Sequence, residues 1–205
     1  MRAKKKELIL KAAFEVFIRH GYRRATMGEI AEEAEISRPA VYLEFANKEA
    51  VFRAMLLHYY EQRRARAAQR LRSAATLRER LGVVLQVWSV EIYERLNGSP
   101  EGRDLRLRAI SATSDVRHQG LRMFEDQVDE AIRRSTEVEG GAVDGRALDL
   151  PLLAPLIVAS SRGLEQAATS QQQLKRLLDT MIEVLAAALG IGEARPRPAA
   201  RRRAG

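Results

Sequence analysis

Apolar residues recur through almost the whole chain at alternating spacings of three and one, which is the pattern of helices with one buried face. In the first run the residues that share a face are Ile9, Ala12, Ala13, Val16 and Phe17. Gly21 follows this run, and glycine often ends a helix because it adopts the left-handed backbone conformation without strain. The pattern predicts a first helix that ends near residue 20.

The next part of the chain contains two short helical patterns. Thr26 and Glu29 have the spacing of a capping box, which predicts the start of a second helix. Ser37 is a favourable N-cap for a third helix, predicted to run to about residue 44, and Pro39 falls in its first turn, where a missing amide does no harm. Because Pro39 has no N–H, we expect the Ser37 side chain to accept a hydrogen bond from the amide of Ala40.

Longer helices are predicted for the rest of the chain. Asn47 caps a fourth helix that continues to about residue 72, and apolar stripes predict further helices over about 77–96, 102–112 and 116–138. Two more helices follow Asp149, a candidate cap, and the last of them stops at Gly190. No strand pattern competes with these helices. The expected fold is all-α.

The expected organisation has three parts. Residues 1–46 form a compact group of three short helices, residues 47–192 form a larger helical body, and residues 193–205 form a basic tail with too little apolar content to fold alone.

Composition and charge narrow the class of protein. The chain has 205 residues, is 46% hydrophobic and contains no cysteine, so it can bury a core and has no disulfides or thiolate metal site. No apolar run has the roughly 18 residues that a membrane span needs, and the basic N-terminus lacks the apolar segment of a secretory signal. We therefore expect a cytoplasmic protein that does not enter a membrane.

The net charge of +8 is concentrated at the two ends of the chain. The basic residues there are Arg2, Lys4, Lys5 and Lys6, and Arg195, Arg197, Arg201, Arg202 and Arg203. Basic ends indicate a polyanionic partner such as nucleic acid. A coding bias toward Arg and Ala, together with solubility, is the alternative for the C-terminal tail.

The sequence lacks the patterns of an enzyme. His20, His58 and His118 are far apart and have no metal-ligand spacing, and there is no nucleophile elbow, phosphate-binding glycine loop or HExxH motif. The carboxylates are mostly spaced to pair with arginines one helical turn away. We expect no catalytic residues, no cofactor and no metal.

The two short helices are separated only by residues 35–37, which is the spacing of a helix-turn-helix unit. Such a unit presents the N-terminus of its second helix to the DNA major groove. The expected base-reading residues are Ser37, Arg38, Pro39 and Ala40, and the expected phosphate contacts are Thr26, Tyr42 and Lys48. Arg38 is the long cation of this surface, and arginine can bind guanine through two hydrogen bonds. The acidic residues lie mainly on the preceding helix, away from this surface.

Three runs of residues carry a resemblance to a known family. They are Ala12, Ala13, Val16, Phe17, Gly21 and Tyr22; then Thr26, Glu29, Ile30, Ala31 and Ala34; then Ile36, Ser37, Val41, Tyr42, Phe45, Lys48 and Glu49. In order and spacing they resemble the N-terminal domain of the TetR (tetracycline-repressor-like) family of bacterial transcriptional regulators. The resemblance implies a homodimeric repressor that a small-molecule effector releases from a pseudo-palindromic double-stranded DNA operator. It also implies that the helical body binds the effector and forms the dimer.

Three positions depart from the family pattern. Glu35 occupies a turn position that is usually glycine, and a left-handed backbone there would cost about 1 kcal/mol. Pro39 replaces the usual small residue. Leu43 and Glu44 replace an aromatic–histidine pair, and we expect Glu44 to remove about one phosphate contact.

Two sets of residues in the body are candidates for the remaining functions. The candidate effector-pocket residues are Trp88, Glu91, Tyr93, His118, Met123, Phe124 and Arg162. For each of them core packing or surface exposure is the alternative; Arg162 is either a cation for an anionic ligand or part of an ion pair. The candidate dimer residues are Ala159, Gly163, Ala167, Leu174, Leu178, Met181 and Leu185, for which an internal core seam is the alternative. A basic protein that coats DNA without sequence preference is a further possibility, against which the base-directed helix argues.

Overall fold

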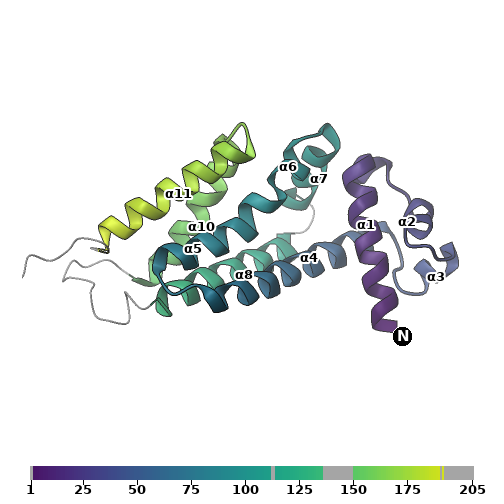
Figure 1. Cartoon of the computed structure of the whole chain (residues 1–205). Helices are drawn as coiled ribbons and strands as arrows, with labels where there is room; N and C mark the ends of the chain where they lie inside the picture. Colours follow the sequence, from purple (N-terminus) through teal and green to yellow (C-terminus); the bar gives the residue numbers. More distant parts are fainter. Residues whose placement is uncertain (1, 112–113, 136–149, 190, 192–205) are drawn as a thin grey trace, which may run out of the picture.

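A computed structural model describes residues 2–111, 114–135, 150–189 and 191. Within these ranges the chain is helical and contains no strand (Figure 1). No helix in the described part is long and apolar enough to cross a membrane. The basic tail from residue 193 and the helix ends predicted at residues 138–141, Asp149 and Gly190 lie outside the described residues.

The N-terminal helices gather at one end of the molecule, and α4 leads from them into the body (Figure 1). The helices of this end are α1 (Arg2–Arg24), α2 (Met27–Glu33), α3 (Arg38–Tyr42) and α4 (Lys48–Arg70). α1 breaks at Gly21, whose φ of 72° is left-handed. The predicted end of the first helix is thus confirmed, with one further short turn reaching Arg24.

The body is built from the helices that follow. They are a short 3-10 turn η1 (Leu71–Ser73), α5 (Leu77–Leu85), the π-helical η2 (Gln86–Val90), α6 (Glu91–Asn97), α7 (Pro100–Ser111), α8 (Ser114–Arg133), α10 (Leu150–Ala167) and α11 (Gln171–Ala188). α4 and α8 run side by side through the body, and α7 lies against α1 (Figure 1).

Two apolar cores hold the molecule together. The first, the N-terminal core, contains residues of α1, α2 and the first half of α4, together with Val41 of α3 and Phe45. Leu105 of α7 and Val116 of α8 complete it. The second fills the body, from Ala67 of α4 to Ile191. α4 therefore contributes residues to both cores. The domain boundary at residue 46 remains a prediction.

The apolar stripe after residue 77 forms one continuous helical stretch, as predicted, but a π-helical turn interrupts its α-helical geometry. Trp88 lies in this turn and is buried, and its indole N–H donates to the Oε1 of Gln127 at 2.6 Å. The Gln127 amide in turn donates to the carbonyl of Arg64 at 2.8 Å. The indole of Trp88 is therefore fixed between α4 and α8.

Candidate nucleic-acid interface and effector cavity

The start of α2 is fixed by the predicted capping box. Thr26 Oγ1 accepts from the Glu29 amide at 3.2 Å, and Glu29 Oε2 accepts from the Thr26 amide at 2.7 Å. Hydrogen bonds from the Thr26 hydroxyl and amide hold the pKa of Glu29 below its usual value. Glu29 is thus occupied by its own helix. Thr26 itself is exposed at the surface.

The turn between α2 and α3 is a Schellman motif without glycine. The Ile36 amide donates to the Ala31 carbonyl at 3.0 Å, and the Glu35 amide donates to the Glu32 carbonyl at 3.0 Å. Glu35 has a φ of 54° and is the only non-glycine residue with positive φ among the described residues. The left-handed backbone considered from the sequence is therefore present, at a cost of about 1 kcal/mol.

The start of α3 presents the predicted reading surface to solvent. Ser37 Oγ accepts from the Ala40 amide at 3.4 Å, which confirms the expected cap. Ser37, Arg38 and Pro39 are exposed and Ala40 is half-buried. α3 ends at Tyr42, two residues before the predicted end. The side chain of Leu43, the next residue, is 76% exposed.

The side of α3 opposite the exposed surface packs in the N-terminal core, as does the segment that follows it. Val41 and Phe45 are buried there. The guanidinium of Arg38 lies 5.7 Å from the centre of the exposed Tyr42 ring. The ammonium of Lys6, in the basic start of α1, lies 5.7 Å from the Phe45 ring. Arg38 thus places positive charge on the exposed start of α3, and Lys6 places a second cation near Phe45, just after this helix.

The acidic residues that precede α3 do not cover this face. Glu33 pairs with Arg19 of α1 at 2.9 Å, and Glu29 is held by Thr26. Glu32 and Glu35 are exposed at the end of α2 and in the turn. The negative charge of α2 is therefore partly paired with Arg19 of α1.

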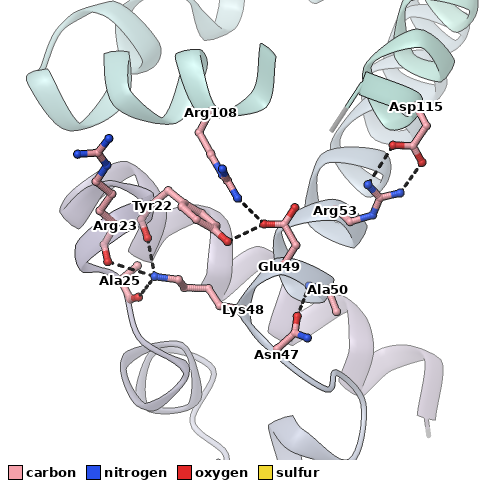
Figure 2. Close-up of polar contacts among 10 residues, drawn as sticks. All are labelled: Tyr22, Arg23, Ala25, Asn47, Lys48, Glu49, Ala50, Arg53, Arg108 and Asp115. Carbon is pink, nitrogen blue, oxygen red and sulfur yellow. Dashed lines mark hydrogen bonds and ion pairs between the residues drawn. The ribbon is translucent and has the colours of Figure 1, made fainter. Parts of the chain in front are cut away.

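Lys48 has a role that the sequence did not indicate. Its Nζ donates to the carbonyls of Tyr22 (2.8 Å), Arg23 (3.1 Å) and Ala25 (2.8 Å), as Figure 2 shows. Burial, and then the charge of Arg108, lower the pKa of Lys48. All three N–H donors of the ammonium are directed to the end of α1, so Lys48 ties α1 to the start of α4. Its predicted phosphate contact would have to compete with these three bonds.

A polar cluster joins α4 to α1 and α7 (Figure 2). Glu49 Oε2 accepts from the Tyr22 hydroxyl and from Arg108 Nη2, both at 2.7 Å. The Arg108 guanidinium also lies 4.4 Å from the centre of the Tyr22 ring. Burial alone would raise the pKa of Glu49, but the hydrogen bonds from Tyr22 and Arg108 outweigh it and lower this pKa.

Two further contacts join the N-terminal end to the body. Arg53 of α4 forms a two-pronged ion pair with Asp115 at the start of α8 (Figure 2). Arg95 of α6 pairs with Glu15 of α1 at 2.6 Å and lies 4.6 Å from the Phe14 ring. The orientation of the helix-turn-helix unit is thus set by contacts to α6, α7 and α8.

A cavity of about 120 Å³ lies between the two cores. Its wall contains aromatic residues from α1, α4, η2 and α8. They include Phe14, Tyr59, Tyr60, Trp88 and Phe124. Trp88 stacks on Phe124, with ring centres 4.9 Å apart and planes 2° apart, and Tyr60 lies 6.2 Å from Trp88.

Residues 9–55 match the family model described as bacterial regulatory proteins, tetR family. This segment therefore matches the N-terminal domain of the TetR family. YuxN, an uncharacterised HTH-type transcriptional regulator of Bacillus subtilis, is 40% identical over 58 residues, which are 28% of this chain and 20% of YuxN. The HTH-type transcriptional activator FasR of Mycolicibacterium smegmatis is 32% identical over 87 residues, or 42% of this chain and 40% of FasR. The chain thus spans less than half the length of these two relatives.

The whole fold is shared with solved TetR-family structures. A TetR transcription regulator from Haloarcula marismortui superposes with a TM-score of 0.69 over 91% of this chain and 98% of that one, at 19% identity. At this identity the likeness establishes the fold alone. It agrees with the expected arrangement of a TetR-type helix-turn-helix domain followed by a helical body.

Three of the seven candidate pocket residues line the cavity, namely Trp88, Phe124 and Arg162. Glu91, Tyr93, His118 and Met123 do not line this cavity, and their assignment to an effector pocket stays a prediction. Glu91 pairs with Arg66 at 2.7 Å and with Arg70, and the hydrogen bonds from these arginines outweigh the effect of burial and lower the pKa of Glu91.

The other three candidate residues that do not line the cavity lie in different surroundings. The buried Tyr93 hydroxyl donates to the Ala168 carbonyl, His118 is exposed, and Met123 packs against the core of the body. On α8 the cavity instead receives Arg117, Gly120, Leu121 and Phe124. The sequence indicated which helices were central but not how α8 is rotated. No feature of the sequence indicated that α1 and α4 also contribute residues to the cavity wall.

The candidate dimer residues divide into two groups. Ala159, Gly163 and Ala167 are exposed on α10, and Met181 and Leu185 of α11 are half-buried. The interpretation of Leu174 and Leu178 as interface residues is wrong, because both are buried in the core of the single chain. They form the internal core seam, which was the alternative interpretation of these residues in the sequence.

The apolar and small residues that α10 and α11 leave exposed, together with the half-buried Met181, form a different stripe. On α10 it comprises Leu152, Leu156, Ala159 and Gly163, and on α11 it comprises Met181, Val184 and Ala188. Leu156 and Val184 are 56% and 63% exposed. Their spacing of three and four residues places them on one face of each helix.

Proposed function

We propose that this protein is a ligand-responsive, sequence-specific DNA-binding transcriptional regulator that represses its target until an effector releases it. The observation that carries the proposal is the capped, exposed start of α3 within a TetR-type helix-turn-helix unit. Its apolar side is fixed in a core, so the exposed side chains have a defined orientation. We place this activity in the cytoplasm, where the DNA of a bacterium lies.

In this proposal α3 enters the major groove with its N-terminus first. Ser37, Arg38, Pro39 and Ala40 read base edges, and Arg38 is the residue suited to a two-pronged contact with guanine. Thr26 and Tyr42, which are exposed on either side, contact phosphates. Lys48 holds α1 and α4 in place and contacts phosphate more weakly than its position in the sequence indicates.

Two copies of the protein bind one operator. We propose that the apolar stripes of α10 and α11 pair with those of a second copy to form a four-helix interface. A two-fold dimer presents two copies of α3 to successive major grooves, which requires a pseudo-palindromic operator.

The effector acts through the cavity between the two cores. Its wall includes residues of α4 and α7, and these helices also hold α1 through Lys48, Glu49 and Arg108. A ligand that binds better when α4 and α7 are displaced lowers DNA affinity by the ratio of its affinities for the two arrangements. The direction of regulation follows from the position of the operator relative to the promoter; the relative FasR is named an activator.

The test compares the wild type with Arg38→Ala on a selected duplex and on random DNA at one salt concentration. We expect Arg38→Ala to cost about 1–3 kcal/mol on the selected duplex and much less on random DNA. Arg64→Ala removes the same charge from an exposed site on α4 and serves as the control. Equal losses on both kinds of DNA would instead identify a sequence-indifferent DNA-coating protein.

A further inference from the structure

Four helices each place one arginine on the wall of the cavity. Arg63 comes from α4, Arg106 from α7, Arg117 from α8 and Arg162 from α10. Glu165 is the one carboxylate among the residues that line it. Among the described residues, none of the four guanidinium groups forms a hydrogen bond or an ion pair with another side chain or with a carbonyl. The cavity therefore carries an excess of positive charge.

Arg63 is the most deeply placed of the four. The residue is only 8% exposed, and its Nε and Nη2 atoms are buried without a hydrogen-bond partner. The guanidinium lies 4.4 Å from the centre of the Tyr59 ring and 5.9 Å from that of Trp88. These ring contacts use the flat face of the guanidinium, while its N–H edges still lack acceptors.

Arg106 and Arg117 share one feature with Arg63, because the Nε atom of each is buried without a hydrogen-bond partner. The charges of Arg63, Arg162 and Arg117 all act on the buried phenol of Tyr60, whose pKa is raised by burial in spite of them. All three of these arginines line the same cavity as Tyr60. A guanidinium stays charged in a protein, so burial without an anion is unfavourable, most of all for Arg63.

The rest of the wall suits an apolar group. Besides the stacked Trp88 and Phe124, it contains Met55, Leu105 and Leu121. A dry engineered cavity of roughly 150 Å³ accepts benzene, so a cavity of about 120 Å³ has room for one ring or a short chain.

We infer that this cavity binds a small organic carboxylate with a ring-sized apolar body, whose anionic group pairs with Arg63 and its neighbouring arginines. Carboxylates fit the fork of N–H donors that a guanidinium offers. The inference rests on the proposed function only where it calls this molecule the effector. Apolar amines, which would place a further cation among the four arginines, are excluded by the same charges.

Trp88 provides a direct readout, because it is the only tryptophan of the chain and lies in the wall of the cavity. Its fluorescence is titrated, without DNA, with phenylacetate, phenylacetamide and 2-phenylethylammonium, which share a ring and differ in charge. Phenylacetate is expected to bind about tenfold or more tightly than phenylacetamide, as a charge-assisted hydrogen bond implies, and the ammonium compound is expected not to bind. Inorganic phosphate serves as a further probe, and binding as tight as that of phenylacetate would show that charge alone suffices and overturn the need for an apolar body.

Arg63→Met and Arg117→Met remove one cavity charge each, and Arg64→Met removes an exposed charge from α4 as the matched control. Arg63→Met is expected to abolish the preference for phenylacetate over phenylacetamide, and Arg117→Met to reduce it. Circular dichroism and retained phenylacetamide binding check that each variant is folded. If Arg63→Met does not fold, the result for Arg117→Met decides.

Besides tight phosphate binding, three results would overturn the inference: no binding of the acid at millimolar concentration, equal or tighter binding of the amide or amine, or an unchanged preference in the arginine variants. The proposed function fails separately. If phenylacetate binds but leaves operator affinity unchanged, the anion site stands and the proposed switch does not. If an amine binds the cavity and releases the DNA, the regulator stands and the anion site does not.

Discussion

At the scale of single residues, the side chain of Lys48 joins two helices through the backbone. Its ammonium satisfies three carbonyls where α1 ends, and lies 4.7 Å from the centre of the Tyr22 ring. These carbonyls would otherwise lack helical partners, and a cation at a helix C-terminus is also favoured by the helix dipole. Lys48 thus stabilises the junction on which the orientation of α3 depends.

We predict that Lys48→Met lowers the free energy of unfolding by about 1–2 kcal/mol, because charge-assisted bonds to three carbonyls are lost. Urea unfolding followed by circular dichroism measures this change. Lys11→Met, which removes an exposed lysine paired with Glu7, is the control and should change stability by less than about 0.5 kcal/mol. Unchanged stability, with a uniform loss of affinity for all DNA, would assign Lys48 to phosphate binding alone.

The contrast between Lys48 and the helix caps shows what can be predicted for a single residue. The caps formed by Thr26, Ser37 and Asn47 were predictable, because each bonds to an amide three residues further along the chain. The partners of Lys48 lie 23–26 residues earlier. They become its neighbours only through the packing of α1 on α4, which local sequence does not specify.

At the scale of elements, α4 and α7 connect the DNA-binding end with the cavity. Glu49 of α4 accepts hydrogen bonds from Tyr22 of α1 and Arg108 of α7, so its carboxylate bridges three helices. The pKa of Glu49 is lowered by these bonds. A lowered pKa means that the ionised form stabilises the folded protein above the usual glutamate pKa, and that this contribution is lost as the pH falls through the folded-state pKa.

We therefore predict that Glu49→Gln costs about 0.5–1 kcal/mol of stability at pH 7, an amount that allows for solvent screening of this partly exposed pair. The difference between variant and wild type should shrink as the pH falls below about 4.3, the usual glutamate pKa. Unfolding in urea at pH 7 and at lower pH measures both quantities. Glu61→Gln, an exposed change on the same helix, is the control, and a difference that does not vary with pH would contradict the account.

The helices themselves were largely predictable from apolar periodicity, but their neighbours were not. The stripe of α11 correctly indicated a buried face at Leu174 and Leu178. Periodicity does not say whether the same chain or a second copy covers that face, so these residues were misinterpreted as dimer contacts. The π-helical turn at Gln86–Val90 also gave no signal, because it adds a backbone irregularity to an otherwise regular stripe.

At the scale of the whole molecule, the proposed dimer depends on the exposed stripes of α10 and α11. We predict that Val184→Glu weakens dimerisation at least tenfold, because it places a charge at the centre of an apolar interface. Sedimentation equilibrium over a range of concentrations measures the dissociation constant. Leu107→Glu alters a leucine of α7 that is 60% exposed and should leave the dimer unchanged. Equal effects of the two substitutions would place the interface elsewhere.

The cavity is a property of the whole molecule and was only partly predictable. Trp88 and Phe124 were predicted as pocket residues because they are aromatic and lie on central helices, and both line the cavity. The unpaired arginines could not be recognised in the sequence, since a buried Arg63 and an exposed Arg64 are adjacent and chemically identical. Only the packing of α4, α7, α8 and α10 around one space distinguishes them.

The most direct test of the account is selection of binding sites by the purified protein from a pool of random DNA duplexes. We predict enrichment of one pseudo-palindromic sequence that is bound by two copies of the chain. Its two half-sites should be centred about one helical turn, roughly 10–11 base pairs, apart. Failure of any sequence to be enriched, or enrichment of a single half-site bound by one copy, would contradict it.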